Sequence, residues 1–176
     1  MHKILAVSGS LRESSYNTAA IKALQLLAPE YIEITIASIG DLPLFNPDRE
    51  EESIPEVEAL AQAVNRSDAL IVASPEYAHG ISGPMKNALD WLVGGVDIPY
   101  KPIMLINTSP RASHAQDSLR EVLKTMSTIV VEKACVSIPL LSSNLDALGI
   151  IDDEAISNTL KGGLDELYGV IFRGHL

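Results

Sequence analysis

The chain has 176 residues, 47% of them hydrophobic, and its 23 acidic against 13 basic side chains give a formal net charge of −10. A chain of this size buries its own core, so we expect residues 1–176 to form one domain. The negative charge repels nucleic-acid phosphates and anionic lipid headgroups, so neither nucleic acid nor a membrane is an expected partner. The apolar start of the chain is too short for a signal peptide or a membrane span, which makes the cytoplasm the expected location.

Apolar runs of strand length alternate with segments of helical period from one end of the chain to the other. In chain order we expect a strand at 3–8 and a helix at 17–27, a strand at 32–37 and a helix at 54–64, a strand at 69–74 and a helix at 84–93, a strand at 102–108 and a helix at 115–126, and a strand at 130–138 and a helix at 153–171. This alternation predicts an α/β fold with a parallel sheet covered on both faces. Right-handed crossovers favour a flavodoxin-like, doubly wound sheet of five parallel strands in the order 2-1-3-4-5.

Local features support the expected helices. The apolar residues Ala20, Ile21 and Leu24 recur at the spacing of one helix face. Pro55 suits the first turn of the second helix, and Gly94 suits the residue after the third.

Three loops become the candidates for function, because ligands of such sheets bind outside the carboxyl ends of the strands, where the strand order reverses. These loops are SGSLRESSYN after the first strand, PEYAHGISG after the third and SPRASHAQ after the fourth. All three are rich in small or polar residues.

The first loop has the donors of an anion site. It leads into a helix, whose first N–H groups are unpaired and lie at the positive end of the helix dipole. Neutral donors come from the side chains of Ser10, Ser14, Ser15 and Asn17, and charged donors come from the guanidinium of Arg12. Together these donors favour a phosphate as the ligand. Neither G-x-x-x-x-G-K-[ST] nor G-x-G-x-x-G is present, which disfavours a nucleoside triphosphatase and a Rossmann dehydrogenase.

Alternative interpretations apply to single residues of these motifs. Ser15 or Asn17 alone could simply cap the first helix. The four histidines show no ligand spacing and Cys135 is the only cysteine, so we expect no disulfide and no metal site. The motif G-x-S-x-G is also absent, which weakens a hydrolase interpretation of the serines.

Two motifs resemble signatures of the NADPH-dependent FMN reductase family, a flavodoxin-like group that includes quinone, azo-dye and chromate reductases. GSLRESSYN at 9–17 resembles the pattern G-S-x-R-x-x-S-x-N. SPEYAHGISGPMKNALDWL at 74–92 is similar to the second signature, P-E-Y-x-x-x-x-x-G-x-x-K-N-A-x-D-W, and DLPLFNPD at 41–48 is similar to the loop after the second strand.

The resemblance implies where FMN binds. It assigns the phosphate to Ser10, Arg12, Ser15 and Asn17 and the isoalloxazine and ribityl part to Pro75, Glu76, Tyr77, Ala78 and Ser109. Many members carry asparagine after P-E-Y, where this chain has Ala78 and then His79, so one side-chain contact is expected to be absent or replaced. Pro110, in the loop after the fourth strand, lacks an N–H and removes one donor.

The same resemblance implies an FMN-dependent NAD(P)H oxidoreductase. Hydride would pass from NADPH or NADH to bound FMN and then to a quinone, flavin, azo compound or similar small-molecule acceptor, by a ping-pong mechanism without a catalytic side-chain acid or base. Relatives commonly form homodimers or homotetramers, so a homo-oligomer is implied. The alternatives are a flavodoxin-type electron carrier, whose usual phosphate loop lacks a cation such as Arg12, and a flavin-free protein that kept the fold.

Overall fold

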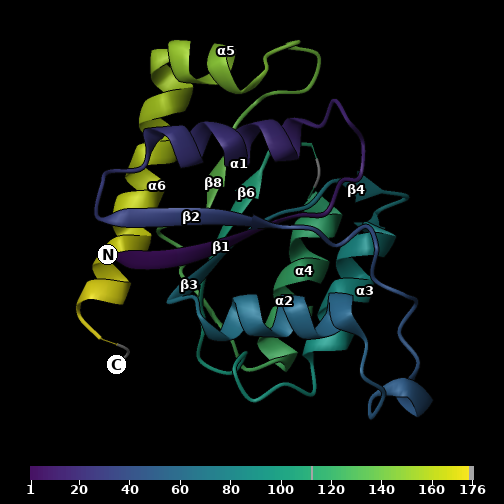
Figure 1. Ribbon diagram of the computed structural model, residues 1–176. Helices are drawn as coiled ribbons and strands as arrows, with labels where there is room; N and C mark the ends of the chain where they lie inside the picture. The colour runs from purple at the N-terminus through teal and green to yellow at the C-terminus, as the bar shows by residue number, and fades with distance from the viewer. Residues whose placement is uncertain (112, 175–176) are drawn as a thin grey trace.

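A parallel sheet forms the centre of the protein in the computed structural model, which describes residues 1–111 and 113–174 (Figure 1). Its strands are β1 (His2–Ser8), β2 (Ile32–Ala37), β3 (Ala69–Ala73), β6 (Pro102–Asn107), β7 (Ile129–Val130) and β8 (Val136–Ser137). They pair in the order β2-β1-β3-β6-β7, and β8 also pairs with β6. All these pairs are parallel, which confirms the predicted flavodoxin-like order with β7 and β8 together in the fifth position.

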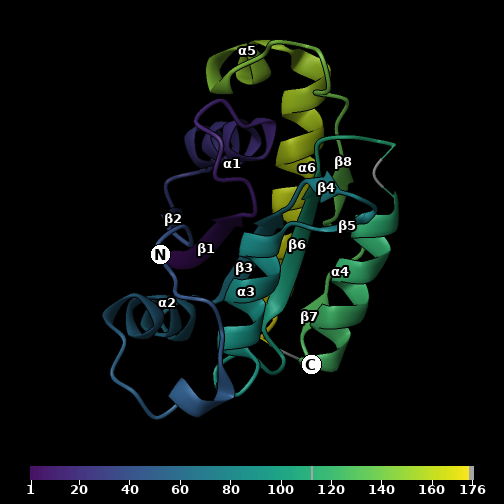
Figure 2. The same ribbon diagram turned by 90° about the vertical axis from the view of Figure 1, so that its right-hand side faces the viewer.

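Six helices accompany the sheet in the described part of the chain: α1 (Tyr16–Leu27), α2 (Pro55–Asn65), α3 (Gly83–Leu92), α4 (Ser113–Thr125), α5 (Ala147–Asp152) and α6 (Glu154–Phe172). Figure 2 shows α1, α5 and α6 on one side of the sheet and α2, α3 and α4 on the other. Alternate residues of β1 face the two sides, since Ile4 packs in the core with α1 and α6 while Leu5 packs with α2, α3 and α4. The predicted cover of helices on both faces is therefore confirmed. None of the described helices combines the length and the apolar character that crossing a membrane requires.

The predicted continuous strand at 130–138 is wrong, because the chain forms two strands of two residues with a turn between them. In the turn, the Ala134 N–H donates to the Val131 carbonyl at 2.8 Å. Glu132 and Lys133 are exposed at this turn, since charged side chains are costly in a strand that is buried on both faces. Next to the interruption, the Leu105 N–H of β6 donates to the Cys135 thiol sulfur at 3.4 Å, and burial raises the pKa of this thiol.

Three short elements were not predicted from the sequence. They are the hairpin of β4 (Glu76–Tyr77) and β5 (Gly80–Ile81), the 3-10 helix η1 (Pro47–Arg49), and α5. The hairpin turn has Ala78 and His79 at φ 50° and 59°, the left-handed pair of a type I′ turn. Asparagine and glycine usually occupy such turns, so the sequence lacks the signal that predicts one.

A pair of glycines in α6 tests how tightly this helix packs on the sheet. A Cβ on Gly163 would lie 2.6 Å from the Ala134 carbonyl oxygen, whereas a Cβ on Gly162 would meet nothing within 4 Å. We expect Gly163→Ala to lower the free energy of unfolding by roughly 1–3 kcal/mol through overpacking. Gly162→Ala should instead raise it by about 0.5–1 kcal/mol, since alanine favours a helix over glycine. Urea unfolding of the two variants measures the difference, and equal effects would contradict the tight contact.

Candidate functional site

A cleft of about 210 Å³ lies at the carboxyl ends of β1, β3 and β6, where the strand order reverses. We call it the strand-end cleft. It is lined by Ser10, Arg12, Ser14, Ser15, Tyr16, Asn17, Ser74, Pro75, Glu76, Tyr77, Asn107, Thr108, Ser109 and Leu141. The structure therefore brings together every predicted site residue except Ala78, which lies in the hairpin turn.

The loop from β1 to α1 approaches the rest of the site very closely at Gly9. The Gly9 N–H donates to the Ala73 carbonyl at 2.8 Å, and the Ser82 hydroxyl donates to the Gly9 carbonyl at 2.6 Å. A Cβ on Gly9 would lie 2.7 Å from the Ser74 hydroxyl and 2.8 Å from the Ser82 hydroxyl. Only glycine fits here, because any side chain would push the loop away from β3 and α3.

Within this loop, the buried polar side chains use their oxygen atoms as acceptors. The Ser15 hydroxyl accepts from the Thr18 N–H at 3.3 Å and caps α1, and the Ser10 hydroxyl accepts from the Arg12 N–H at 3.4 Å. The predicted capping role of Ser15 is thus present, but it occupies only the lone pairs of the oxygen. The hydroxyl hydrogens of Ser10 and Ser15 remain available to a ligand.

Asn17, in the first turn of α1, also uses its side-chain oxygen as an acceptor and keeps its donors available. Its Oδ1 accepts from the Thr108 hydroxyl at 3.2 Å, which links α1 to the end of β6. The two N–H donors of its amide remain available. In the described part of the chain, the Arg12 guanidinium has no ion pair or hydrogen bond. The loop thus offers donors and few acceptors, the arrangement that a phosphate requires.

The hairpin of β4 and β5 forms the opposite wall of the strand-end cleft with Pro75 and Tyr77. Glu76 in the same wall turns its carboxylate to α4, where Oε2 accepts from the Ala115 N–H at 2.9 Å. Its Oε1 lies 3.1 Å from the Nδ1 atom of His79. The carboxylate therefore anchors the hairpin to α4, and the contribution of Glu76 to a ligand is expected from its backbone.

Tyr77 and Ser109 keep groups available for a ligand. The Tyr77 side chain is half exposed, at 50%, and can cover an aromatic ring. The Ser109 N–H donates to the Asn107 side-chain oxygen at 3.0 Å, so the hydroxyl is what Ser109 offers.

Several lining residues were not among the predicted site residues. Three of them lie at the ends of buried strands: Ser74 follows β3, Asn107 ends β6 and Thr108 follows it. Their position next to the reversal of strand order could have predicted them as site residues. Tyr16 lies inside the first signature but carries no letter of its pattern. Leu141 comes from the loop after β8, and nothing in the sequence placed that loop beside the strand-end cleft. Among the described residues, no group of three or more histidine, cysteine, aspartate or glutamate side chains could hold a metal ion.

Comparisons with known proteins agree with this geometry. The family model described as NADPH-dependent FMN reductase matches residues 2–141, well over half of the chain. The chain belongs to the NADPH-dependent FMN reductase family. This confirms the predicted family, and with it an oxidoreductase that uses FMN and NAD(P)H.

Individual members of the NADPH-dependent FMN reductase family resemble the chain over most of its length. An NAD(P)H-dependent FMN reductase of Pseudomonas aeruginosa is 34% identical over 160 residues, covering 87% of this chain and 86% of the relative. A quinone reductase of Escherichia coli K12 is 30% identical over 171 residues, covering 92% of this chain and 91% of the relative. The solved structure of a flavoenzyme NAD(P)H:(acceptor) oxidoreductase from Paracoccus denitrificans has a TM-score of 0.84 at 30% identity and covers 100% of both chains.

The second signature of the family also positions the loop at 41–48. Asn87 donates to the Pro43 carbonyl at 2.9 Å and accepts from the Phe45 N–H at 2.8 Å. The indole N–H of Trp91 donates to the same carbonyl at 2.8 Å, and its ring meets Phe45 edge to face. Asn87 and Trp91 therefore hold a loop in place, and neither of them lines the strand-end cleft.

The anchor at Glu76 predicts a pH dependence of stability. Mainly because the Ala115 N–H donates to it, the pKa of the Glu76 carboxyl lies below its ordinary value of 4.5. A carboxyl whose pKa is lowered in the folded state stabilises the protein at pH values above its ordinary pKa. This contribution to the free energy of unfolding disappears as the pH falls through the lowered pKa. We expect Glu76→Gln to melt below the unsubstituted protein near neutral pH and the gap to close in acid.

Thermal unfolding followed by circular dichroism from about pH 7 to about pH 3 measures this gap. Glu166→Gln is the matched control, because Glu166 is exposed on α6 and has no ion pair or side-chain hydrogen bond among the described residues. A gap for Glu76→Gln that stays constant with pH would show that the carboxylate charge does not anchor the hairpin.

Proposed function

We propose that the protein is an FMN-dependent NAD(P)H oxidoreductase that reduces quinones and related small-molecule acceptors by a ping-pong mechanism. The observation that carries this proposal is the set of available donors on Ser10, Arg12, Ser15 and Asn17 in and after the loop from β1 to α1, at the position where the family binds the FMN phosphate. Relatives named quinone reductase and 2-hydroxy-1,4-benzoquinone reductase, the latter 34% identical over 176 residues, support a quinone as the acceptor.

The residues of the strand-end cleft fit FMN. The hydroxyls of Ser10 and Ser15, the Asn17 amide and the Arg12 guanidinium would hold the phosphate, each through a hydrogen that the protein itself does not use. Pro75 and Tyr77 would flank the isoalloxazine ring, with backbone groups of the hairpin meeting its polar edge. When bound, FMN supplies the hydride chemistry, accepting from the nicotinamide and donating to the acceptor in two separate half-reactions.

The carboxylate of the cleft agrees with hydride transfer that needs no protein acid or base. Glu76 carries the only carboxylate among the residues that line the strand-end cleft, and it is bound to Ala115 and His79. Arg12 carries a permanent charge. The chain's own contribution is therefore to bind and orient the cofactor and to bring the two substrates against it in turn.

A homodimer or homotetramer is part of the proposal, supported by the family resemblance. Leu11 and Leu44 expose 58% and 83% of their surface, although both are large and apolar. A Cβ on Gly40 would lie 3.4 Å from the Cδ2 atom of Leu11, so Leu11 lies beside the loop that also carries Leu44. Assembly would remove this apolar surface from water.

The role of Arg12 is tested by its removal. We expect Arg12→Ala to weaken FMN binding by about 1–3 kcal/mol, the value of a charge-assisted hydrogen bond. Fluorescence titration of the apoprotein with FMN measures the dissociation constant. Arg66→Ala is the matched control, because Arg66 is equally exposed but follows α2 and lies outside the cleft. Equal dissociation constants for the Arg12 variant and the unsubstituted protein would show that the arginine does not contact the FMN phosphate.

Kinetics distinguish the reductase from the flavodoxin-type carrier. Because one reduced cofactor serves two substrates in turn, double-reciprocal plots at several quinone concentrations should give parallel lines with NADPH as the varied substrate. Anaerobic NADPH should also bleach the flavin absorbance of the FMN-loaded protein promptly. Converging lines would reject the ping-pong order, and a flavin that NADPH leaves oxidised would favour the carrier.

A further inference from the structure

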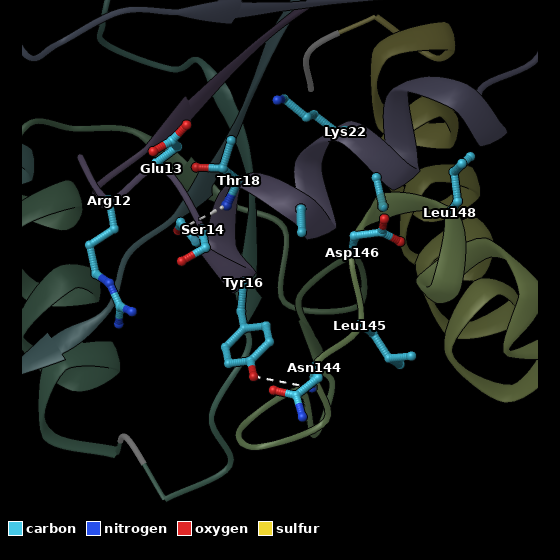
Figure 3. Close-up of a pocket in the computed structure, with 13 residues that line it drawn as sticks. Arg12, Glu13, Ser14, Tyr16, Thr18, Lys22, Asn144, Leu145, Asp146 and Leu148 are labelled. Atoms are coloured by element: carbon cyan, nitrogen blue, oxygen red, sulfur yellow. Dashed lines mark hydrogen bonds between the residues drawn. The ribbon is translucent and has the colours of Figure 1, made fainter.

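A second and larger cavity lies on the other side of the phosphate loop. It has a volume of about 560 Å³ and separates the first two turns of α1 from residues 144–148, which lead into α5 (Figure 3). We call it the α1–α5 cavity. It is lined by Arg12, Glu13, Ser14, Ser15, Tyr16, Thr18, Ala19, Lys22, Asn144, Leu145, Asp146, Ala147 and Leu148. Its size is that of a small-molecule site.

The α1–α5 cavity adjoins the strand-end cleft. Residues Arg12, Ser14, Ser15 and Tyr16 line both. Tyr16 is fixed between them, since its hydroxyl accepts from the Asn144 N–H at 3.2 Å, a contact that Figure 3 shows at the lower end of the cavity. One ligand could therefore occupy both spaces by passing over residues 12–16, where Arg12 and Ser14 line both.

The lining of the α1–α5 cavity combines an apolar wall with charges of both signs. Leu145 and Leu148 line the cavity from the segment that leads into α5, and Ala19 and Ala147 add small apolar surfaces. Lys22 projects from the second turn of α1 and makes no ion pair or side-chain hydrogen bond among the described residues. Glu13 and Asp146 contribute carboxylates, and one oxygen of Asp146 already caps α5 by accepting from the Gly149 N–H at 2.9 Å.

This combination disfavours simple ligands. A small inorganic anion could pair with Lys22 but would meet two carboxylates and leave the leucines uncovered, and a purely apolar molecule would cover the leucines but use neither Lys22 nor the carboxylates. An adenosine phosphate meets all three demands. Its base can lie on the apolar wall, its amino and ribose hydroxyl groups can donate to the carboxylates, and its phosphate can accept from a lysine.

We propose that the α1–α5 cavity binds the adenosine half of the nicotinamide dinucleotide, with Lys22 facing the 2′-phosphate that distinguishes NADPH from NADH. The inference rests on the proposed function, because the nicotinamide must reach the flavin in the strand-end cleft. The diphosphate that joins the two halves then passes Arg12 and Ser14, which line both spaces. Lys22 is thereby the residue that determines the choice between the two nucleotides.

The first test is a change of nucleotide preference. We expect Lys22→Ala to lower the ratio of kcat/KM for NADPH to kcat/KM for NADH by roughly three- to tenfold, the effect of one exposed charge-assisted contact. Lys124→Ala is the control, because Lys124 is also exposed but lies near the end of α4, outside both cavities. An unchanged ratio in the Lys22 variant would overturn the proposal.

A second variant probes the apolar wall. Leu148→Ser should raise KM for NADPH and for NADH alike, by roughly three- to tenfold, because the adenine is common to both. Leu26→Ser is a close control, since the exposed fractions of Leu148 and Leu26 are 64% and 63% and Leu26 lies outside the cavity. If the two leucine variants behave alike, the adenine lies elsewhere.

A binding measurement separates this proposal from the proposed function. Calorimetric titration of the FMN-loaded protein with adenosine 2′,5′-bisphosphate should show binding that Lys22→Ala weakens and that NADPH displaces. Binding of 5′-AMP with equal strength and no dependence on Lys22 would point to a free adenine nucleotide as the ligand and overturn the assignment. Binding with the expected dependence in a protein that NADPH does not reduce would reject the reductase but keep the nucleotide site.

Discussion

The close approach of Gly9 to β3 and α3 is the constraint on which the rest of the site depends. Where β1 ends, the backbone passes so near the Ser74 and Ser82 hydroxyls that no side chain fits. Hydrogen bonds from the Gly9 N–H to Ala73 and from Ser82 to the Gly9 carbonyl keep it there. From this fixed point the loop leads into α1, and the side-chain oxygen atoms of Ser10, Ser15 and Asn17 accept hydrogen bonds from Arg12, Thr18 and Thr108, which leaves their hydrogens available to a ligand.

The loops of the site are joined to one another by hydrogen bonds that cross large distances in the sequence. Asn17 and Thr108 join α1 to β6, and Glu76 joins the β4–β5 hairpin to the first turn of α4. The hairpin also needs two left-handed residues, Ala78 and His79, at a conformational cost that only glycine or asparagine largely avoids. The Glu76 anchor helps to offset that cost, and the wall that carries Tyr77 thereby keeps its position.

The two cavities share Arg12, Ser14, Ser15 and Tyr16, an arrangement that would connect cofactor binding with nucleotide choice. Arg12 contributes to both spaces, so one guanidinium can contact the phosphate of the flavin on one side and a diphosphate on the other. Tyr16 separates the spaces and is held by the backbone of Asn144, a residue with φ 57° in a loop that also contains left-handed Ser142. Residues 144–148 lie beyond the part of the chain that the family model matches, and they shape one side of the α1–α5 cavity.

The sequence by itself determined the order of the sheet, the cover of helices and the chemistry of the first loop, because periodicity and residue type are local properties. It could not show that the run at 130–138 is interrupted, since that depends on where Glu132 and Lys133 meet solvent beside β6. Nor could it show the hairpin, whose turn lacks the usual residues, or the carboxylate of Glu76 turning to α4. Tertiary structure alone decided that Leu141 lines the strand-end cleft and that residues 144–148 lie against α1, because the hydrogen bond between Tyr16 and Asn144 joins residues that are 128 positions apart in the sequence.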